Sequence, residues 1–245
     1  FHFNNFMDYM ILQRIISILI SVLTIIPIYF LCKRFSNRFY AILAAALFVF
    51  EPHIIQNSLF GITDPLYILL LTISLVLFTS SNKKIMYVSF SIVALASIVR
   101  VEGMFTFISL SILFFLRYKK ERKIIIKYCL VLSIFILSLL PMIIFRIENV
   151  GNDNLGSRVI TAGNGIISES FHQNSTFSMQ LISSVKTFLH FFGLSLLPVF
   201  IIFVPLGTYL LFKNKNKNTM MIIIPILLLL ISSYAAYFSE VKDTR

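Results

Sequence analysis

The chain has 245 residues, of which 58% are hydrophobic, and its mean hydropathy of +0.91 excludes an ordinary soluble domain and predicts a polytopic membrane protein. A net charge of +11 would suggest nucleic-acid binding in a soluble protein, but here the basic residues fall in short turns between apolar runs. That pattern is typical of membrane orientation, so nucleic acid is not expected as a partner. Cys32 and Cys129 lack the spacing of a metal site.

The apolar runs predict an all-α, polytopic helix bundle with about eight membrane passes. In chain order they are Met10–Cys32, Phe39–Phe50, Pro65–Thr79, Ile85–Val99, Met104–Leu116, Tyr128–Phe145, Phe188–Phe212 and Met220–Phe238. Several of these runs are short, because about 15 helical residues rise roughly 22 Å while the hydrocarbon core is about 30 Å thick. Hydropathy alone therefore does not settle the short passes.

Four basic turns between the runs add the information that hydropathy lacks. They are Lys33–Arg38, Ser81–Lys84, Arg117–Lys127 and Lys213–Lys217, and together they carry 14 of the 21 Lys and Arg residues. If each run crosses once, all four turns lie on one side, which the positive-inside rule makes cytoplasmic. Nine of the ten acids then lie outside, and only Glu121 lies inside. We expect a multi-pass plasma-membrane protein with basic loops inside and acidic loops outside.

The segment Arg100–Gly103, with the sequence RVEG, interrupts the apolar stretch from Ile85 to Leu116. One long helix would place the flanking basic turns on opposite sides, whereas two short helices place both inside and RVEG at the external tip of a hairpin. Because the helices are short, this tip is expected to be recessed, and recessed ionisable residues are functional candidates. The alternative is that Arg100 and Glu102 extend to the lipid headgroups.

The second external turn, Phe50–Tyr67, concentrates polar side chains between two membrane helices. Glu51 and His53 could bind a divalent cation, and Asp64 could complete the set of ligands. Asp64 followed by Pro65 also suits a helix start, with Asp64 as the N-cap. These two roles for Asp64 are compatible, and both stay open.

The segment 146–187 is predicted to be an external loop, partly folded over the outer face, and it contains a glycosylation sequon at Asn174–Thr176. The sequence has no P-loop, Rossmann glycine fingerprint, HExxH or GxSxG motif. Soluble nucleotide chemistry therefore has no visible site.

An ordered set of short motifs runs through the chain. Arg14 and Ser17 form R-x-x-S, the basic turn and a small-residue helix follow, and then come TDPL at Thr63–Leu66 and the RVEG hairpin. In this order the chain resembles the GT-C glycosyltransferases, and its nearest branch looks like the protein O-mannosyltransferase and lipid-A aminoarabinose transferase group. The closing residues Glu240–Arg245 resemble the start of that group's T-R-Y segment.

The resemblance implies that residues 1–245 form a single GT-C transmembrane domain, truncated at both ends. It implies transfer of a sugar from a polyprenyl-phosphate donor to a protein or lipid acceptor at the external face, often with a divalent metal ion. The family's catalytic carboxylate is implied to lie upstream of Phe1, because Asp8 does not match its pattern. The residues expected to form the site are Asp64 and Glu51 as catalytic carboxylates, Arg100, Glu102 and Arg245 at the donor phosphate, and His53 at the metal.

Two other functions are open to a polytopic membrane chain. A transporter or flippase for lipid-linked sugars would also need recessed charges, and it predicts broken helices with charges near the middle of the membrane and often internal repeats. The sequence shows neither feature, and its charges cluster at one face. A non-catalytic membrane scaffold subunit would explain the passes but not the nine acids on one side.

Overall fold

The computed structural model describes residues 6–119, 121–150, 185–187, 207, 209 and 223–230, and the regular structure in these ranges is α-helical. The all-α prediction is thereby confirmed for the described part of the chain. Its contacts divide it into two units, Phe1–Ile144 and Phe145–Arg245. The candidate site lies in the first unit.

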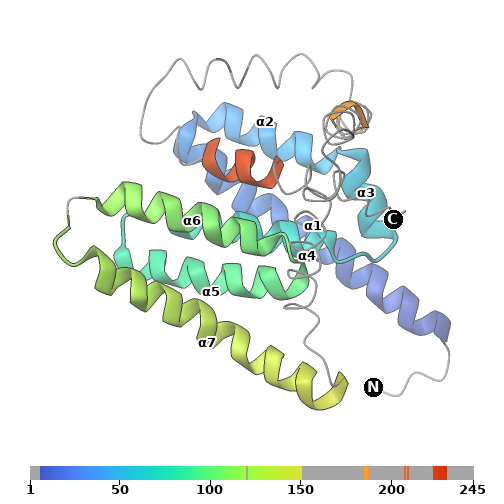
Figure 1. Ribbon diagram of the computed structural model, residues 1–245. Coiled ribbons are helices and arrows are strands. Elements are labelled where there is room, and N and C mark those ends of the chain that lie inside the picture. Colours follow the sequence, from blue (N-terminus) through green and yellow to red (C-terminus); the bar gives the residue numbers. More distant parts are fainter. Residues whose placement is uncertain are drawn as a thin grey trace, which may run out of the picture. The chain divides into compact units, whose positions relative to one another are not determined.

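Seven helices with defined bounds follow one another in the sequence (Figure 1). They are α1 (Phe6–Phe35), α2 (Arg38–Val49), α3 (Pro52–Leu59), α4 (Asp64–Phe78), α5 (Lys83–Val99), α6 (Gly103–Tyr118) and α7 (Ile124–Val150). Six of them match the first six apolar runs. The exception is α3, which occupies the segment expected to be an external turn.

Within the described residues, two helical segments are long and apolar enough to span a membrane, and they are Tyr9–Phe35 and Ile124–Phe145. A third span results if α2 and α3, which meet at a bend of 48°, are taken together. The prediction of about eight passes is therefore not supported in the described part of the chain. The physical reason is length, because α4, α5 and α6 have 15, 17 and 16 residues, whereas a span needs about 20. Most of the last two apolar runs lies outside the described residues.

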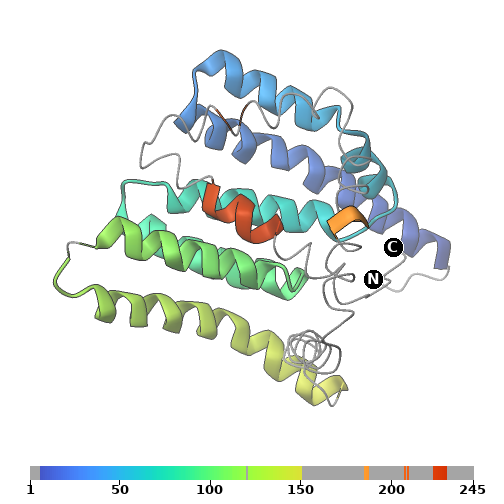
Figure 2. The same cartoon turned by 45° about the horizontal axis from the view of Figure 1, so that its top comes forward.

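The helices of the first unit pack side by side in the order α2, α1, α4, α5 and α6 (Figure 2). α7 lies against α5 and α6, where Phe135 stacks on Phe107 with ring centroids 4.0 Å apart and Ser138 hydrogen-bonds Ser91. The buried centre joins α4, α5 and α6 through the edge-to-face rings of Phe78, Phe90 and Phe114, which are all fully buried. Such contacts hold these short helices in fixed register.

Three of the predicted basic turns meet at one end of these helices. We call this the basic end and define it as Lys33–Arg38, Thr79–Lys84, which adds two residues to the predicted turn Ser81–Lys84, and Arg117–Lys127. Arg34 donates to the Thr79 hydroxyl, and Arg117 donates to the Phe78 and Ser80 carbonyls at 2.6 and 2.7 Å. Glu121 accepts hydrogen bonds from both Lys83 and Lys127. The fourth turn lies outside the described residues, and the assignment of the basic end to the cytoplasm stays a prediction.

Candidate functional site

Arg100 lies between two carboxylates at the end of the helices opposite the basic end. Its Nη1 donates to Asp64, which is 36 positions away in the sequence, and its Nε and Nη2 donate to the two carboxylate oxygens of Glu102 at 3.3 and 2.9 Å. The side chains of Arg100, Asp64 and Glu102 are 37%, 23% and 39% exposed. This acid–base cluster is held in place by its contacts and is still accessible to a ligand.

Helix ends place all three charged groups. Val99 ends α5, Arg100 follows in an extended conformation, and Glu102 stands at the N-cap of α6. The predicted break of the Ile85–Leu116 stretch into two helices is therefore confirmed. The prediction that Asp64 is an N-cap is wrong by one residue, because Thr63 is the N-cap and Asp64 begins α4. A carboxylate in the first turn still interacts favourably with the helix dipole.

Neighbouring helices hold the segment that leads to Asp64. Asn57 of α3 donates to the second carboxylate oxygen of Asp64 at 3.0 Å. From α1, Gln13 donates to the Gly61 carbonyl at 2.7 Å and Ser17 donates to the Ile62 carbonyl at 3.3 Å.

The R-x-x-S motif thus contacts the site through Ser17, whereas Arg14 is exposed. Gln13 was missed from the sequence, although a glutamine inside an apolar helix is itself a signal.

Two hydroxyl side chains beside the cluster were also missed. The Tyr67 ring lies 5.9 Å from the Arg100 guanidinium carbon. The Tyr67 and Thr106 hydroxyls are buried and interact with each other, yet neither completes a well-formed hydrogen bond with any described residue. The sequence spacing could have indicated both residues. Tyr67 is three residues after Asp64 and Thr106 is four residues after Glu102, so each hydroxyl lies on the same helix face as a carboxylate of the cluster.

The cluster combines one cation with two carboxylates, so it carries an excess of negative charge. Burial works to raise the pKa of Glu102, but the hydrogen bonds from Arg100 and the backbone outweigh it and leave the pKa below its usual value. Glu102 is therefore ionised at neutral pH and keeps Arg100 oriented. Because Arg100 already donates hydrogen bonds to Asp64 and Glu102, only its remaining N–H donors are available to a ligand.

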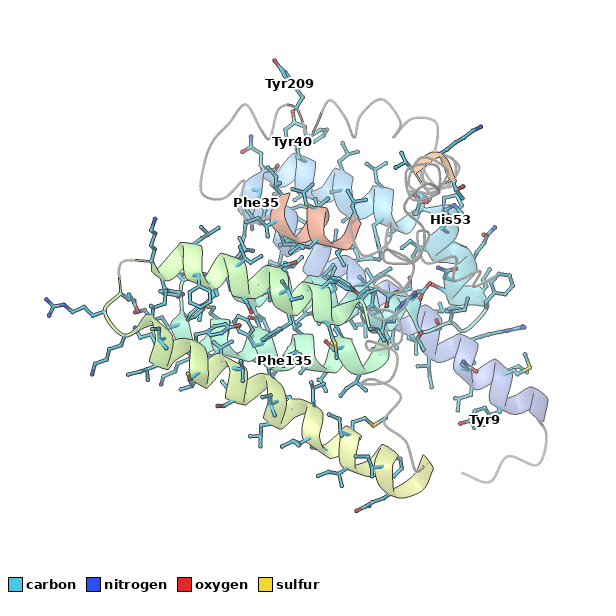
Figure 3. The ribbon with its side chains drawn as sticks, viewed as in Figure 1. Tyr9, Phe35, Tyr40, His53, Phe135 and Tyr209 are labelled. Carbon is cyan, nitrogen blue, oxygen red and sulfur yellow. The ribbon has the colours of Figure 1, made fainter. Side chains whose placement is uncertain are left out.

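The remaining predicted site residues do not join the cluster. Glu51 is the N-cap of α3 and, within the described residues, has no hydrogen bond or ion pair with Asp64 or Arg100. His53 is exposed on α3 (Figure 3). The described part of the chain holds no group of three His, Cys, Asp or Glu side chains that could bind a metal. Arg245 and most of the loop 146–187 lie outside the described residues.

An apolar cavity of about 210 Å³ opens between α1, α2 and α3. Its lining is mainly aliphatic and includes two serines, Ser21 and Ser58. α3 connects this cavity to the charged cluster, because Ser58 lines the cavity while Asn57 holds Asp64. A hydrocarbon chain suits such a lining.

The chain matches no known family profile, no curated protein and no solved structure. The resemblance to GT-C glycosyltransferases therefore stays a prediction from the sequence.

Proposed function

We propose that the chain is the core of a GT-C-type membrane glycosyltransferase, which transfers a sugar from a polyprenyl-phosphate donor to a protein or lipid acceptor. The observation that supports it best is the pairing of Arg100 with Asp64 and Glu102. In this proposal the charged cluster faces the exterior, the basic end faces the cytoplasm, and the short helices also cross the membrane.

The donor phosphate binds Arg100 in this proposal. A guanidinium has five N–H donors in a planar fork. Glu102 occupies the Nε and one Nη2 donor, and Asp64 occupies one Nη1 donor, so two donors stay free for a phosphate. Glu102 acts as the positioning residue, because its two oxygens fix the plane of the guanidinium.

Asp64 is the carboxylate that we assign to the acceptor. A phosphate on the two free donors of Arg100 would lie beside Asp64, which stays held by Arg100 and Asn57. A carboxylate in that position can accept the proton of an attacking hydroxyl. The apolar cavity lined by α1, α2 and α3 offers space for part of the donor's hydrocarbon chain.

A divalent metal does not fit the described residues, because Glu51, His53 and Asp64 form no ligand group. No step of this proposal is therefore routed through a metal. Glu51 keeps only the role of a half-buried carboxylate at the start of α3.

The first test of the proposal is a transfer assay with a polyprenyl-phosphate sugar. Asp64→Asn should abolish transfer while membrane insertion is retained, and activity near wild type would remove Asp64 from the mechanism. Photo-crosslinking with a polyprenyl phosphate tests binding separately. Arg100→Gln should lose the label, whereas Arg14→Gln, which removes one positive charge from an exposed position on α1, should keep it.

The bend between α2 and α3 favours a second candidate, a flippase for lipid-linked sugars, because transporters use interrupted helices near their substrate sites. Reconstituted vesicles distinguish the two functions. A flippase would move the lipid-linked sugar across the bilayer without an acceptor, and a transferase would consume it only when an acceptor is present.

A further inference from the structure

We propose that the basic end is a binding surface for anionic phospholipid headgroups, a role that does not depend on the charged cluster at the other end. Its described side chains include many lysines and arginines but Glu121 as the sole acid. Clusters of cations beside membrane helices attract anionic headgroups.

Some of these cations are already used inside the protein. Arg117 binds two backbone carbonyls, Arg34 binds Thr79, and Glu121 is shared by Lys83 and Lys127. Lys33 lies over the Tyr29 ring, 5.7 Å from its centroid. The others are exposed and have no ion pair among the described residues; they are Arg38, Lys84, Lys119, Arg122 and Lys123. These five side chains are free to bind an external anion. In Figure 3, side chains with blue nitrogen tips extend from the α6–α7 turn.

Exposed apolar residues adjoin the free cations and identify the partner as a bilayer. Phe39 follows Arg38 and is 72% exposed, and Ile125 and Ile126, just after Lys123, are 72% and 66% exposed. Nucleic acid or an acidic protein would neutralise the cations but leave this apolar surface in water. A lipid leaflet covers both, with acyl chains on the apolar part and headgroups at the cations.

Helix length strengthens the attraction. α4, α5 and α6, with 15 to 17 residues, rise roughly 22–26 Å, which is less than the hydrocarbon core of about 30 Å. When these helices cross the membrane, as in the proposed function, the bilayer must thin locally or long basic side chains must reach outward, and either change brings headgroups close to the cations.

Lipid competition on the full chain tests this surface. The chain is purified in neutral detergent, and bound phosphatidylglycerol and phosphatidylcholine are compared by native mass spectrometry and by Tm. We expect phosphatidylglycerol to bind preferentially and to raise Tm, with the gain shrinking as salt is added. Each of Lys84→Gln, Arg122→Gln and Lys123→Gln should weaken phosphatidylglycerol binding about 5-fold.

Arg14→Gln is the matched control, because it removes one positive charge from an exposed residue outside the basic end. It should leave the lipid preference unchanged. Equal binding of the two lipids, or an equal loss in Arg14→Gln and the three test variants, would overturn the proposal. A Tm gain from a short oligonucleotide that matched the gain from phosphatidylglycerol would also overturn it, since the surface would then respond to charge alone.

Discussion

Gly103 lies so close to Ser97 that a side chain cannot be placed between them. A Cβ added to Gly103 would be 2.5 Å from the Ser97 backbone nitrogen and 2.6 Å from its Cα. Both atoms belong to the backbone of α5, so relief requires the two helices of the hairpin to separate. We expect Gly103→Ala to destabilise the protein by roughly 1–3 kcal/mol or more, measured as a lower Tm in detergent.

Gly207→Ala is the control for this variant. Among the described residues, no atom lies within 4 Å of a Cβ added there, so the substitution should be neutral or slightly stabilising. An unchanged Tm in Gly103→Ala would show that the α5–α6 hairpin opens at little cost.

The sequence predicted the helices of the first unit better than their number of membrane passes. Apolar runs mark α1, α2 and α4–α7 to within a few residues, and the RVEG interruption correctly separates α5 from α6. It was α3 that was missed, because polar residues in Pro52–Leu59 suggested a loop. The overlooked signal was Pro52 in the first turn, followed by the apolar Ile55 and Leu59 four residues apart.

The candidate site was predicted in its members but not in its contacts. Asp64, Arg100 and Glu102 were each selected from local motifs, whereas the contact between Asp64 and Arg100 depends on how α4 packs against α5. One sequence without homologues carries no signal for such a long-range contact. Glu51 and His53 were placed with Asp64 because they share a short segment. Glu51 and His53 lie at the start of helix α3 and Asp64 lies beyond its end, which is a reason why these three residues do not form a metal-binding group.

Arg117 is expected to stabilise the C-terminal end of α4. Its two donors satisfy the Phe78 and Ser80 carbonyls, which lie at and just beyond the last turn of the helix. Arg117→Met keeps most of the apolar stem but removes both hydrogen bonds, and should cost about 1–3 kcal/mol. Arg122→Met is the control, since Arg122 is exposed without an ion pair among the described residues, and should change stability by less than about 0.5 kcal/mol. Both are compared by Tm in neutral detergent, and equal losses would contradict the prediction.

Gln13 is expected to hold the turn that precedes Asp64. Gly61 is buried with a φ of +69°, and its carbonyl accepts the Gln13 amide. Gln13→Ala leaves that carbonyl without its donor and should cost on the order of 1 kcal/mol. Gln56→Ala is the matched control, because Gln56 is exposed and no hydrogen bond of its side chain is found among the described residues. A Tm loss in Gln56→Ala as large as that in Gln13→Ala would contradict this role.

Gly61→Ala tests the same turn through its backbone. The positive φ costs an L residue about 1–2 kcal/mol, and the new Cβ would lie 3.1 Å from the Gln13 side chain. The Gln13 side chain is flexible, so backbone strain should dominate the effect. We therefore expect Gly61→Ala to lower Tm even in the Gln13→Ala background. If Gly61→Ala leaves Tm unchanged in that background, the destabilisation comes from contact with the Gln13 side chain and not from the backbone conformation.

Glu121 should make stability depend on pH at the basic end. Hydrogen bonds from Lys127 and Lys83 hold the pKa of Glu121 below the ordinary glutamate value of 4.5. A carboxyl whose pKa is lowered on folding stabilises the folded state above its unfolded pKa, and that contribution is lost as pH falls through the folded value. Glu121→Gln should therefore be less stable than wild type at neutral pH, and the difference in stability should narrow below pH 4.5.

Because the pKa of Glu102 is also lowered, wild type changes its stability with pH for a second reason, so the stabilities of the two proteins must be compared at each pH. In a Lys83→Met/Lys127→Met background the same substitution should lose this pH dependence, and its persistence there would assign the effect to another partner.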